Sequence, residues 1–172
     1  MPAEQRLSMV TPIGTLLLRA TGERLAGIEI VAAAVNPTLA QVSGPTPVEI
    51  GDSPVLRQAL LELDQYFAGR RQEFGLPLDL AGRTLFTRRI LETLQAIPYG
   101  TTITYGALAA RAGFPHAARA VGRAMAANPL PIVIPCHRVV AAGGQLGGYS
   151  GGEGLPTKSW LLEFERSNSE RP

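Results

Sequence analysis

A proline-framed apolar segment that ends in the only cysteine constrains this chain more than any other feature. The segment reads Asn128-Pro129-Leu130-Pro131, then Ile132-Val133-Ile134, then Pro135-Cys136. Proline fixes its own φ and holds the residue before it in an extended conformation. We therefore expect a short buried strand over residues 132–134, with Cys136 held at its rigid exit.

Two interpretations of Cys136 are open at this point. A free cysteine is more often a small buried hydrophobe than a nucleophile. However, His137 and Arg138 can both lower the pKa of a neighbouring thiol, and the seven glycines of residues 143–154 let that backbone approach a ligand closely. Adjacent side chains of an extended chain point to opposite faces. His137 would therefore need a bridging water to reach the thiol and a carboxylate from the C-terminal helix to orient it.

The composition excludes several classes of site. One cysteine excludes a cysteine-rich zinc site, two histidines leave little for any other metal, and Val139 stands where a zinc deaminase would place its second cysteine. A lone cysteine forms no internal disulfide and suits a reducing cytosol. Apolar runs such as 132–134 are far shorter than the ~20 residues of a membrane span, and residues 1–10 lack the apolar core of a secretory signal. We expect a cytoplasmic protein without a metal, a cofactor or a membrane segment.

The N-terminal half has the pattern of a small domain with a sheet and a helix. Two strands of a hairpin and then a helix are predicted over residues 15–20, 25–31 and 53–69. Residues 35–54 are rich in proline, glycine, threonine and serine, which predicts a loop, with one short strand expected near 48–50. Residues 76–80 predict a short extended piece, and the domain boundary falls at 82–84.

The C-terminal half is predicted to be mainly helical. Helices are expected over residues 84–97, 104–112 and 116–127 and from residue 156 onward. The break Gly113-Phe114-Pro115 joins the second and third of these helices. Two short helices joined by a glycine turn are typical of a helix-turn-helix. An ordinary pair of core helices has the same pattern.

The positive charge is concentrated in the middle of the chain. Residues 84–140 carry six arginines and one acidic residue, whereas residues 1–83 carry seven arginines and nine acidic residues. A basic block of this kind is typical of a phosphate-facing surface. A solvated basic face without a ligand remains the alternative, because the net charge of the whole chain is only +2.

The helix over 116–127 has mostly small side chains, with two arginines, Arg119 and Arg123. Proteins that read the major groove need long polar side chains to discriminate between bases. If this slim helix binds DNA, we therefore expect weak sequence preference and a strong dependence on phosphate contacts. Such binding suits an enzyme that searches for lesions better than a transcription factor.

The segment Ile134-Pro135-Cys136-His137-Arg138-Val139-Val140 resembles the active-site motif of the O6-alkylguanine-DNA alkyltransferases. The resemblance is collinear over roughly half of the chain. It runs through Phe86, Tyr105, Ala118-Arg119-Ala120-Val121-Gly122, Asn128-Pro129, Gly148-Tyr149-Ser150-Gly151-Gly152, Trp160-Leu161-Leu162 and Glu165. The N-terminal half resembles the family only loosely, through its hairpin and Leu63, Tyr66, Phe67 and Gly69.

The resemblance implies an α+β protein with two domains. Residues 1–83 would form a small α/β domain, RNase H-like, with a hairpin-based sheet and a helix. Residues 84–172 would form a helical, winged-helix-like domain with a helix-turn-helix that binds the minor groove. The implied activity is direct-reversal repair of alkylated double-stranded DNA by a monomer. An alkyl group on O6 of guanine, or on O4 of thymine, would pass irreversibly to the cysteine in a single turnover.

The resemblance also implies roles for individual residues. Cys136 would be the nucleophile, His137 would accept its proton through a water, Glu165 would orient His137, and Asn128 would brace the turn before the cysteine. The base would be bound by Tyr105, Met125, Pro131, Val139 (through its carbonyl), Tyr149 and Ser150. The DNA would be bound by Thr87, Tyr105, Arg119, Ala120 and Gly122, with Tyr105 pressing a phosphate and Arg119 filling the gap left by the flipped base.

Two other functions remain open. A non-catalytic protein that binds alkylated DNA could use the same scaffold, but relatives of that kind replace the cysteine. A Cys-His hydrolase would need neither the arginine block nor the helix-turn-helix. Some relatives hold a structural zinc in the N-terminal domain. This chain lacks the cysteine and histidine ligands there, so we expect none.

Overall fold

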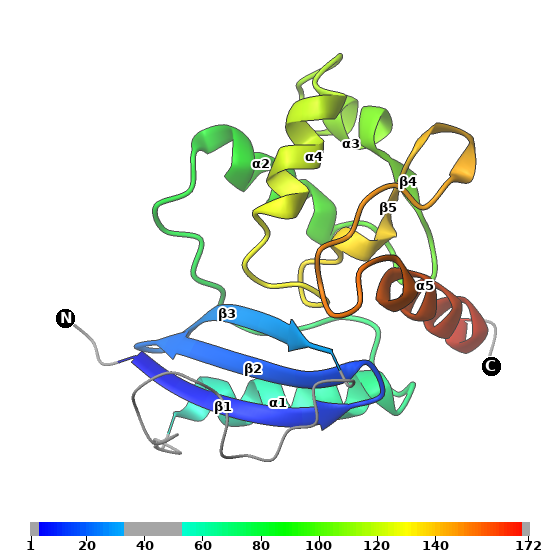
Figure 1. Cartoon of the computed structure of the whole chain (residues 1–172). Coiled ribbons are helices and arrows are strands. Elements are labelled where there is room, and N and C mark those ends of the chain that lie inside the picture. Colours follow the sequence, from blue (N-terminus) through cyan, green and yellow to red (C-terminus); the bar gives the residue numbers. More distant parts are fainter. Residues whose placement is uncertain (1–3, 33–52, 170–172) are drawn as a thin grey trace. The chain divides into compact units, whose positions relative to one another are not determined.

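A computed structural model describes residues 4–32 and 53–169, and the chain divides into two compact units, Met1–Asp79 and Leu80–Pro172 (Figure 1). The first unit holds an antiparallel sheet and a helix, and the second is mainly helical. The predicted α+β class is therefore confirmed. No helix within the two described ranges is both long enough and apolar enough to cross a membrane.

The N-terminal unit is built on a three-stranded antiparallel sheet in the order β1-β2-β3. The strands are β1 (Glu4–Thr11), β2 (Gly14–Thr21) and β3 (Arg24–Val31). The hairpin formed by β2 and β3 was predicted and is confirmed, with a register shift between Arg19 and Ala20. Leu78 of the expected extended piece forms a parallel bridge with Leu25, next to β3.

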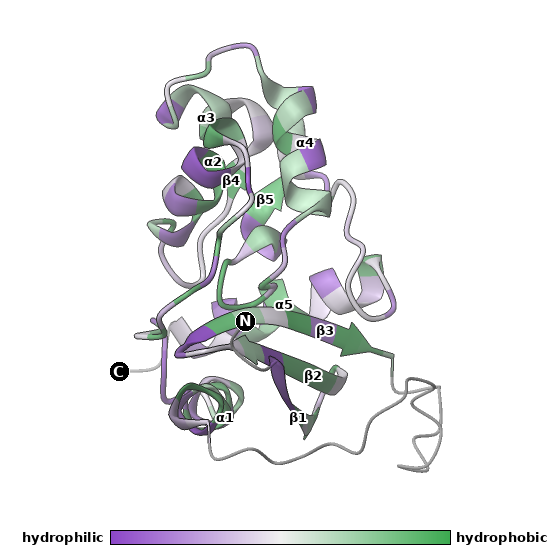
Figure 2. Cartoon of the chain, turned by 90° about the vertical axis from the view of Figure 1, so that its left-hand side faces the viewer, coloured by the Kyte–Doolittle hydropathy of each residue, from purple (hydrophilic) through white to green (hydrophobic). Residues whose placement is uncertain are grey.

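Helix α1 (Pro54–Phe67) packs against the three strands, as Figure 1 shows. Ser53 caps its start by accepting a hydrogen bond from Leu56 N, with Pro54 in the first turn, as predicted. The fully buried side chains of the sheet and the helix include Leu16, Leu18, Leu25, Leu63 and Tyr66, and Figure 2 shows large hydrophobic parts of β2 and β3. Burial of this apolar face stabilises the unit.

Strand β1 was not predicted. Its sequence, EQRLSMVT, is partly exposed over most of its length, so it lacks the strict apolar alternation that identifies a strand. Its eight residues pair one by one with β2. The short strand predicted near 48–50 lies outside the described residues.

The C-terminal unit consists of four helices around a two-stranded parallel sheet. The helices are α2 (Leu85–Gln95), α3 (Tyr105–Arg111), α4 (Ala118–Ala126) and α5 (Leu155–Ser169). The strands are β4 (Ile103–Thr104) and β5 (Val139–Val140), in which Ile103 pairs with Val139 and Thr104 with Val140. Short 3-10 turns, η1 (Cys136–Arg138) and η2 (Ala142–Gly144), lie on either side of β5.

The expected pair of short helices is formed by α3 and α4, which pack against each other and against α2. Thr84 caps α2 and Thr104 caps α3, each by accepting a hydrogen bond from the backbone N–H three residues on. Helix α4 begins at Ala118 rather than at the predicted His116, because His116 has a φ of 71° and so lies outside the helical region.

The strand predicted over residues 132–134 is not formed. Ile132 has a φ of 75°, and Ile134 N donates a hydrogen bond to Leu130 O at 2.8 Å, so the chain makes a tight buried turn. Asn128 stabilises this turn from the side, since its Nδ2 donates to Ile134 O at 2.9 Å and its Oδ1 accepts from Leu130 N at 3.0 Å. The turn, rather than a strand exit, therefore positions Cys136.

Candidate active site

Cys136 is the first residue of the turn η1 and its side chain is buried, with 7% of the residue exposed. Its backbone N–H donates to Ile134 O at 2.8 Å, and Arg138 N donates to Pro135 O at 2.9 Å, which closes the turn. Burial raises the pKa of the Cys136 thiol, while a hydrogen bond from the Asn128 side chain and the charge of Lys158 favour the thiolate. Burial therefore outweighs these contacts, and the pKa of the thiol stays above its ordinary value.

His137 follows Cys136 within the same turn and is fully buried. Its Nε2 lies 2.7 Å from Glu165 Oε1. Its Nδ1 is buried and has no hydrogen-bond partner among the described residues. The sequence predicted an extended chain here, in which the side chains of Cys136 and His137 would point to opposite faces. The chain instead forms a 3-10 turn over these residues, so that constraint does not apply.

Besides His137, Glu165 accepts hydrogen bonds from Arg138 and Gly100, both of which are distant from it in the sequence. Arg138 donates from Nε to Oε2 at 2.8 Å and from Nη2 to Oε1 at 2.9 Å, and Gly100 N donates to Oε2 at 3.1 Å. A two-pronged guanidinium–carboxylate contact of this kind fixes both position and orientation. The Glu165 side chain is fully buried.

Arg138 is buried with Glu165 and was not predicted to be its partner. Its Nη1 donates to Ile97 O at 2.6 Å, and its guanidinium lies 5.7 Å from the centre of the Tyr99 ring. The charge and all three guanidinium nitrogens are thus satisfied inside the unit, which a buried ion pair requires. Arg138 fixes Glu165, and Glu165 in turn fixes His137.

The charges of this cluster determine which nitrogen of His137 can accept a proton. Burial alone would raise the pKa of the Glu165 carboxyl, but the hydrogen bonds and charges of His137 and Arg138 hold it well below its usual range. Burial lowers the pKa of His137, so a neutral imidazole is favoured near pH 7. A neutral His137 beside an ionised Glu165 donates its Nε2 hydrogen to the carboxylate. Its Nδ1 then carries a free lone pair.

Comparisons with known proteins identify the family of the chain. The family model for the 6-O-methylguanine DNA methyltransferase DNA binding domain matches residues 85–167. The model for the ribonuclease-like domain of the same family matches residues 8–80. A methylated-DNA--protein-cysteine methyltransferase of Mycobacterium leprae is 43% identical to the chain, over 92% of the chain and 90% of the relative. The chain belongs to the O6-methylguanine DNA methyltransferase family.

Two further members of this methyltransferase family show how widely the similarity extends. The methylated-DNA--protein-cysteine methyltransferase of Mus musculus is 37% identical, over 94% of the chain and 81% of the mouse protein. A crystal structure of Mycobacterium tuberculosis OGT in complex with DNA is 40% identical and superposes with a TM-score of 0.77, covering 96% of the chain and 93% of that structure.

Lys158 belongs to the same site and sequence reasoning missed it. It is fully buried on α5, and its Nζ donates to the backbone carbonyls of Val139 (2.6 Å) and Gly148 (3.1 Å) and also to that of Leu146. It is the only lysine in the chain, beside fifteen arginines. The presence of a single lysine among so many arginines was the signal in the sequence that could have singled out Lys158. Lys158 ties the loop after β5 to the strand that follows Cys136.

The residues expected to bind the base come from α3, α4, the turn before Cys136, β5 and the loop after β5. Val139 is buried, and its carbonyl already accepts from Lys158, although a carbonyl oxygen has a second lone pair for another donor. The Tyr149 hydroxyl is buried without a partner among the described residues, and burial and the nearby Cys136 raise its pKa. Ser150 is exposed, while Met125 and Pro131 are half-buried.

The residues expected to bind DNA lie on α2, α3 and α4. Arg119 is exposed, while Ala120 and Gly122 are half-exposed, and a Cβ added to Gly122 would meet nothing within 4 Å. Thr87 is half-buried next to the cap of α2. Among the described residues, no group of three histidine, cysteine, aspartate or glutamate side chains could hold a metal ion.

Tyr105 at the start of α3 packs against the glycine loop. A Cβ built on Gly147 would lie 2.8 Å from Tyr105 Oη, and Gly147 has a φ of 69°. Burial raises the pKa of Tyr105, and a hydrogen bond from the Gly148 backbone to its oxygen partly opposes that rise. The loop therefore needs glycine at position 147 both for its conformation and for its closeness to Tyr105.

The substitution Gly147→Ala is expected to slow the alkylation of Cys136 by free O6-benzylguanine about tenfold. The added Cβ would displace Tyr105 or the loop, and a rise of about 1.4 kcal/mol in the reaction barrier corresponds to a tenfold lower rate. The matched control is Gly143→Ala. Gly143 has a φ of 80° in the same loop, but a Cβ there meets nothing within 4 Å. Reaction rates that fall equally in the two variants would show that backbone strain alone, and not the Tyr105 contact, is responsible.

Proposed function

We propose that this chain repairs DNA by direct reversal, transferring the alkyl group of O6-alkylguanine to its own Cys136. The family membership and the names of the relatives support this reaction, and one related crystal structure contains DNA. The observation that carries the proposal is the buried Glu165–His137 contact at 2.7 Å, which leaves the buried Nδ1 of His137 without a partner in the described residues.

The chemistry follows from the protonation states of the cluster. His137 Nδ1 takes the proton of Cys136 through an intervening water, and the imidazolium that forms is stabilised by the ionised Glu165. The thiolate then attacks the alkyl carbon, so an S–C bond forms while the C–O6 bond breaks and its electron pair passes to the guanine. The guanine recovers a proton as it leaves. None of the described residues of the site is suited to breaking the new thioether, so each protein molecule would react once.

Asn128, Lys158 and the buried turn hold the thiol for this reaction. A thiolate needs hydrogen-bond donors and positive charge because its burial is unfavourable. The Asn128 side chain supplies a hydrogen bond to Cys136, and Lys158 supplies charge. Neither residue forms a bond with the alkyl group, so we assign both of them positioning roles.

The substrate base would be bound in the space between Cys136 and the glycine loop. We infer that Tyr149 uses its unpartnered hydroxyl, that Ser150 offers a second polar contact, and that Met125 and Pro131 form apolar walls. The second lone pair of the Val139 carbonyl would accept a hydrogen bond from the exocyclic amine of guanine. O4-alkylthymine, with a similar alkyl ether, would be a second substrate.

We propose that the C-terminal domain, residues 84–172, binds the minor groove through α3 and α4 and rotates the damaged nucleotide out of the duplex. Base flipping costs a few kcal/mol. Tyr105 would press the adjacent phosphate, Arg119 would fill the gap in the stack, and the small surface of Ala120 and Gly122 would allow close approach. Residues 1–83 would form a separate structural domain.

A monomer in the cytoplasm is the form that we propose to act. All residues assigned to the site come from one chain, so no second copy is needed to complete it. The free thiol must stay reduced until it meets a lesion, which suits a reducing compartment. A non-catalytic lesion-binding role on the same scaffold is not favoured, because the cysteine and its oriented histidine are both present.

The proposal is tested by measuring how much O6-methylguanine in a duplex is converted to guanine. A duplex with one O6-methylguanine is incubated with the protein and digested to nucleosides. We expect one unmodified guanine to be restored per protein molecule, with no further repair when DNA is in excess. Cys136→Ser is the control and should leave the lesion in place. Repair that continues over many turnovers, or an unchanged lesion with folded wild-type protein, would refute the proposal.

The substitution Arg119→Ala is expected to slow the repair of duplex DNA while leaving the reaction with free O6-benzylguanine unchanged. The free base needs no flipping, so only the duplex reaction requires a side chain to fill the stack. Losing one contact worth 1.4–2.8 kcal/mol gives a rate reduction of about 10- to 100-fold. The ratio of the two rates is the measurement, and an equal reduction in both reactions would remove the insertion role from Arg119.

A further inference from the structure

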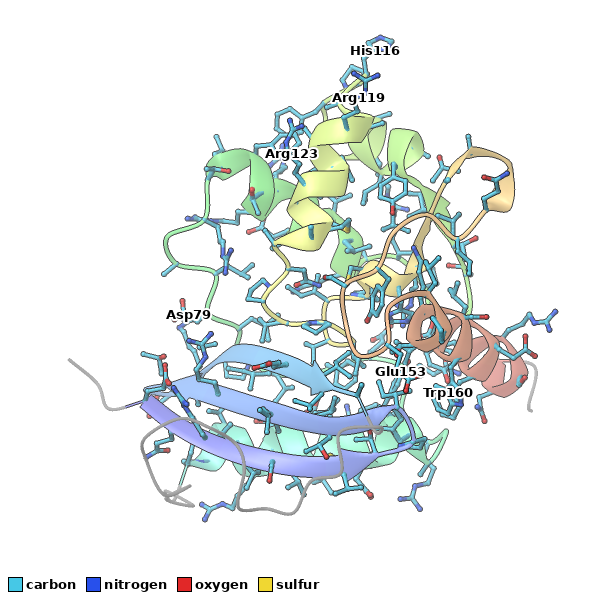
Figure 3. All side chains as sticks on the ribbon, in the orientation of Figure 1. Asp79, His116, Arg119, Arg123, Glu153 and Trp160 are labelled. Atoms are coloured by element: carbon cyan, nitrogen blue, oxygen red, sulfur yellow. The ribbon has the colours of Figure 1, made fainter. Side chains whose placement is uncertain are left out.

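A row of basic side chains, His116, Arg119 and Arg123, follows one face of α4 and the turn before it. Arg119 and Arg123 are four residues apart in a helix, so they project from the same face about one turn apart. His116 lies three residues before Arg119. All three side chains are exposed, and Figure 3 shows them along this segment. In Figure 2 the helix is pale except for hydrophilic segments on its outer side.

The basic row has no acidic partner in the part of the chain that the structure describes. The ion pairs of the C-terminal unit join His137 and Arg138 to Glu165, and Arg166 to Glu163. None of them involves the basic row. Between residues 84 and 140 the only acidic side chain is Glu92, which is exposed on α2. Two arginines without a counter-ion among the described residues, with an imidazole beside them, form a local positive field that attracts phosphate.

We propose that His116 and Arg123 each bind a DNA backbone phosphate on either side of Arg119, so that protonation of His116 strengthens the binding of duplex DNA. The inference rests on the proposed function, because it assumes that α4 faces the duplex. Most of the remaining side chains of α4 are alanine or glycine, so the phosphates can come close to the row. Neither residue reads a base, and both contacts are therefore independent of sequence.

The pH dependence arises from a single side chain. The charged side chains on the three packed helices are Arg88, Arg89 and Glu92 on α2, Arg111 on α3, and Arg119 and Arg123 on α4. Guanidinium groups stay charged, whereas imidazole is the side chain that ordinarily changes charge between pH 5 and 8. Tyr105 on α3 has a raised pKa and stays neutral over this range. His116, in the turn before α4, is the only imidazole of the basic row.

The salt dependence of binding counts the phosphate contacts. Each one adds about 0.9 to the slope of log K against log salt concentration. The probe is an undamaged duplex of arbitrary sequence, titrated by fluorescence anisotropy from 50 to 200 mM salt. At pH 8, Arg123→Ala is expected to reduce the magnitude of the slope by about 0.9. Raising the salt from 50 to 200 mM should therefore weaken DNA binding by this variant about 3.5-fold less than it weakens binding by the wild type. For the wild type, the slope at pH 6 should exceed the slope at pH 8 by up to about 0.9.

Two matched variants isolate the basic row. Arg70→Ala removes the same charge from an exposed site at the end of α1 and should keep the wild-type slope. His116→Gln should show the wild-type pH 8 slope at both pH values, and it retains Cys136 and His137, so their titration cancels in the comparison. An Arg123→Ala slope equal to that of Arg70→Ala or of the wild type would overturn the Arg123 contact. An unchanged pH dependence in His116→Gln would overturn the His116 contact.

The proposed function and this inference can fail separately. Methyl transfer from a lesion duplex is measured on the same variants at low salt and saturating protein, where weakened binding has no effect. Normal methyl transfer, with variants that keep the wild-type salt slopes, would refute only the phosphate contacts proposed for the basic row. Altered slopes without transfer by the wild type would leave a DNA-binding protein with a basic row but without the proposed reaction.

Discussion

The variant Glu165→Gln is expected to lose about 3–5 kcal/mol of unfolding free energy and nearly all of its Cys136 reactivity. Removing one partner of a buried ion pair leaves the other charge uncompensated, and this is the origin of the loss. Here Arg138 is left buried with its charge, and the amide of glutamine turns donors toward the donors of Arg138 or Gly100. A loss of this size is a large part of the 5–15 kcal/mol that stabilises a typical protein.

The matched control is Glu163→Gln, two residues earlier on α5. Glu163 is exposed and pairs with Arg166 and Ser167, so this variant should unfold and react like the wild type. Urea unfolding and the rate of alkylation by O6-benzylguanine are the measurements. Equal behaviour of the two variants would mean that the buried cluster does not stabilise the domain or activate the thiol.

Acid should reveal the same carboxylate in the wild-type protein. The pKa of Glu165 is lowered on folding from an ordinary value of 4.5. The stabilisation that results is present above about pH 4.5 and is lost as the pH falls toward the folded pKa, because only the unfolded chain takes up the proton there. The wild type should therefore lose stability below pH 4.5 more steeply than Glu165→Gln.

The variant Lys158→Met is expected to be the second severe one. It keeps an apolar stem but removes the ammonium that donates to the carbonyls of Val139, Leu146 and Gly148. The Val139 contact is buried, whereas those with Leu146 and Gly148 are part-buried. A buried carbonyl left without a partner costs about 1–3 kcal/mol, so we expect a loss of at least this size and a poorly ordered loop after β5. The charge of Lys158 also favours the Cys136 thiolate, so the thiol pKa should rise further.

The thiol pKa separates a structural from an electrostatic effect. The rate of Cys136 alkylation by iodoacetamide as a function of pH should shift to higher pH in Lys158→Met. Arg166→Met removes one charge from an exposed site of the same helix and should leave the profile in place. A folded Lys158→Met variant with a wild-type profile would mean that its charge does not reach the thiol.

Local signals were sufficient for much of the fold. The caps at Ser53, Thr84 and Thr104 lie within three residues of the N–H groups that they satisfy, so the helix starts could be read from the sequence. The β2–β3 hairpin is equally local. Strand β1 could not be recognised in the same way, because its partly exposed sequence gains its conformation from pairing with β2.

The site depended on contacts that no local pattern encodes. Ile132 is β-branched and is normally favoured in a strand, yet burial and the Asn128 hydrogen bonds hold it in a turn with positive φ. Arg138 meets Glu165 across 27 residues of sequence. The water relay from Cys136 to His137 and the base-binding roles stay predictions, whereas the burial of Glu165 beside His137 is a structural finding.

The most direct test of the central claim is the mass of the intact protein after reaction with a duplex that contains one O6-methylguanine. Transfer predicts a gain of one methyl group per molecule, mapped by peptide fragmentation to Cys136, with no second addition in excess DNA. Cys136→Ser should gain nothing. A folded, DNA-binding wild-type protein whose mass does not change, or a methyl group found on another residue, would contradict the account.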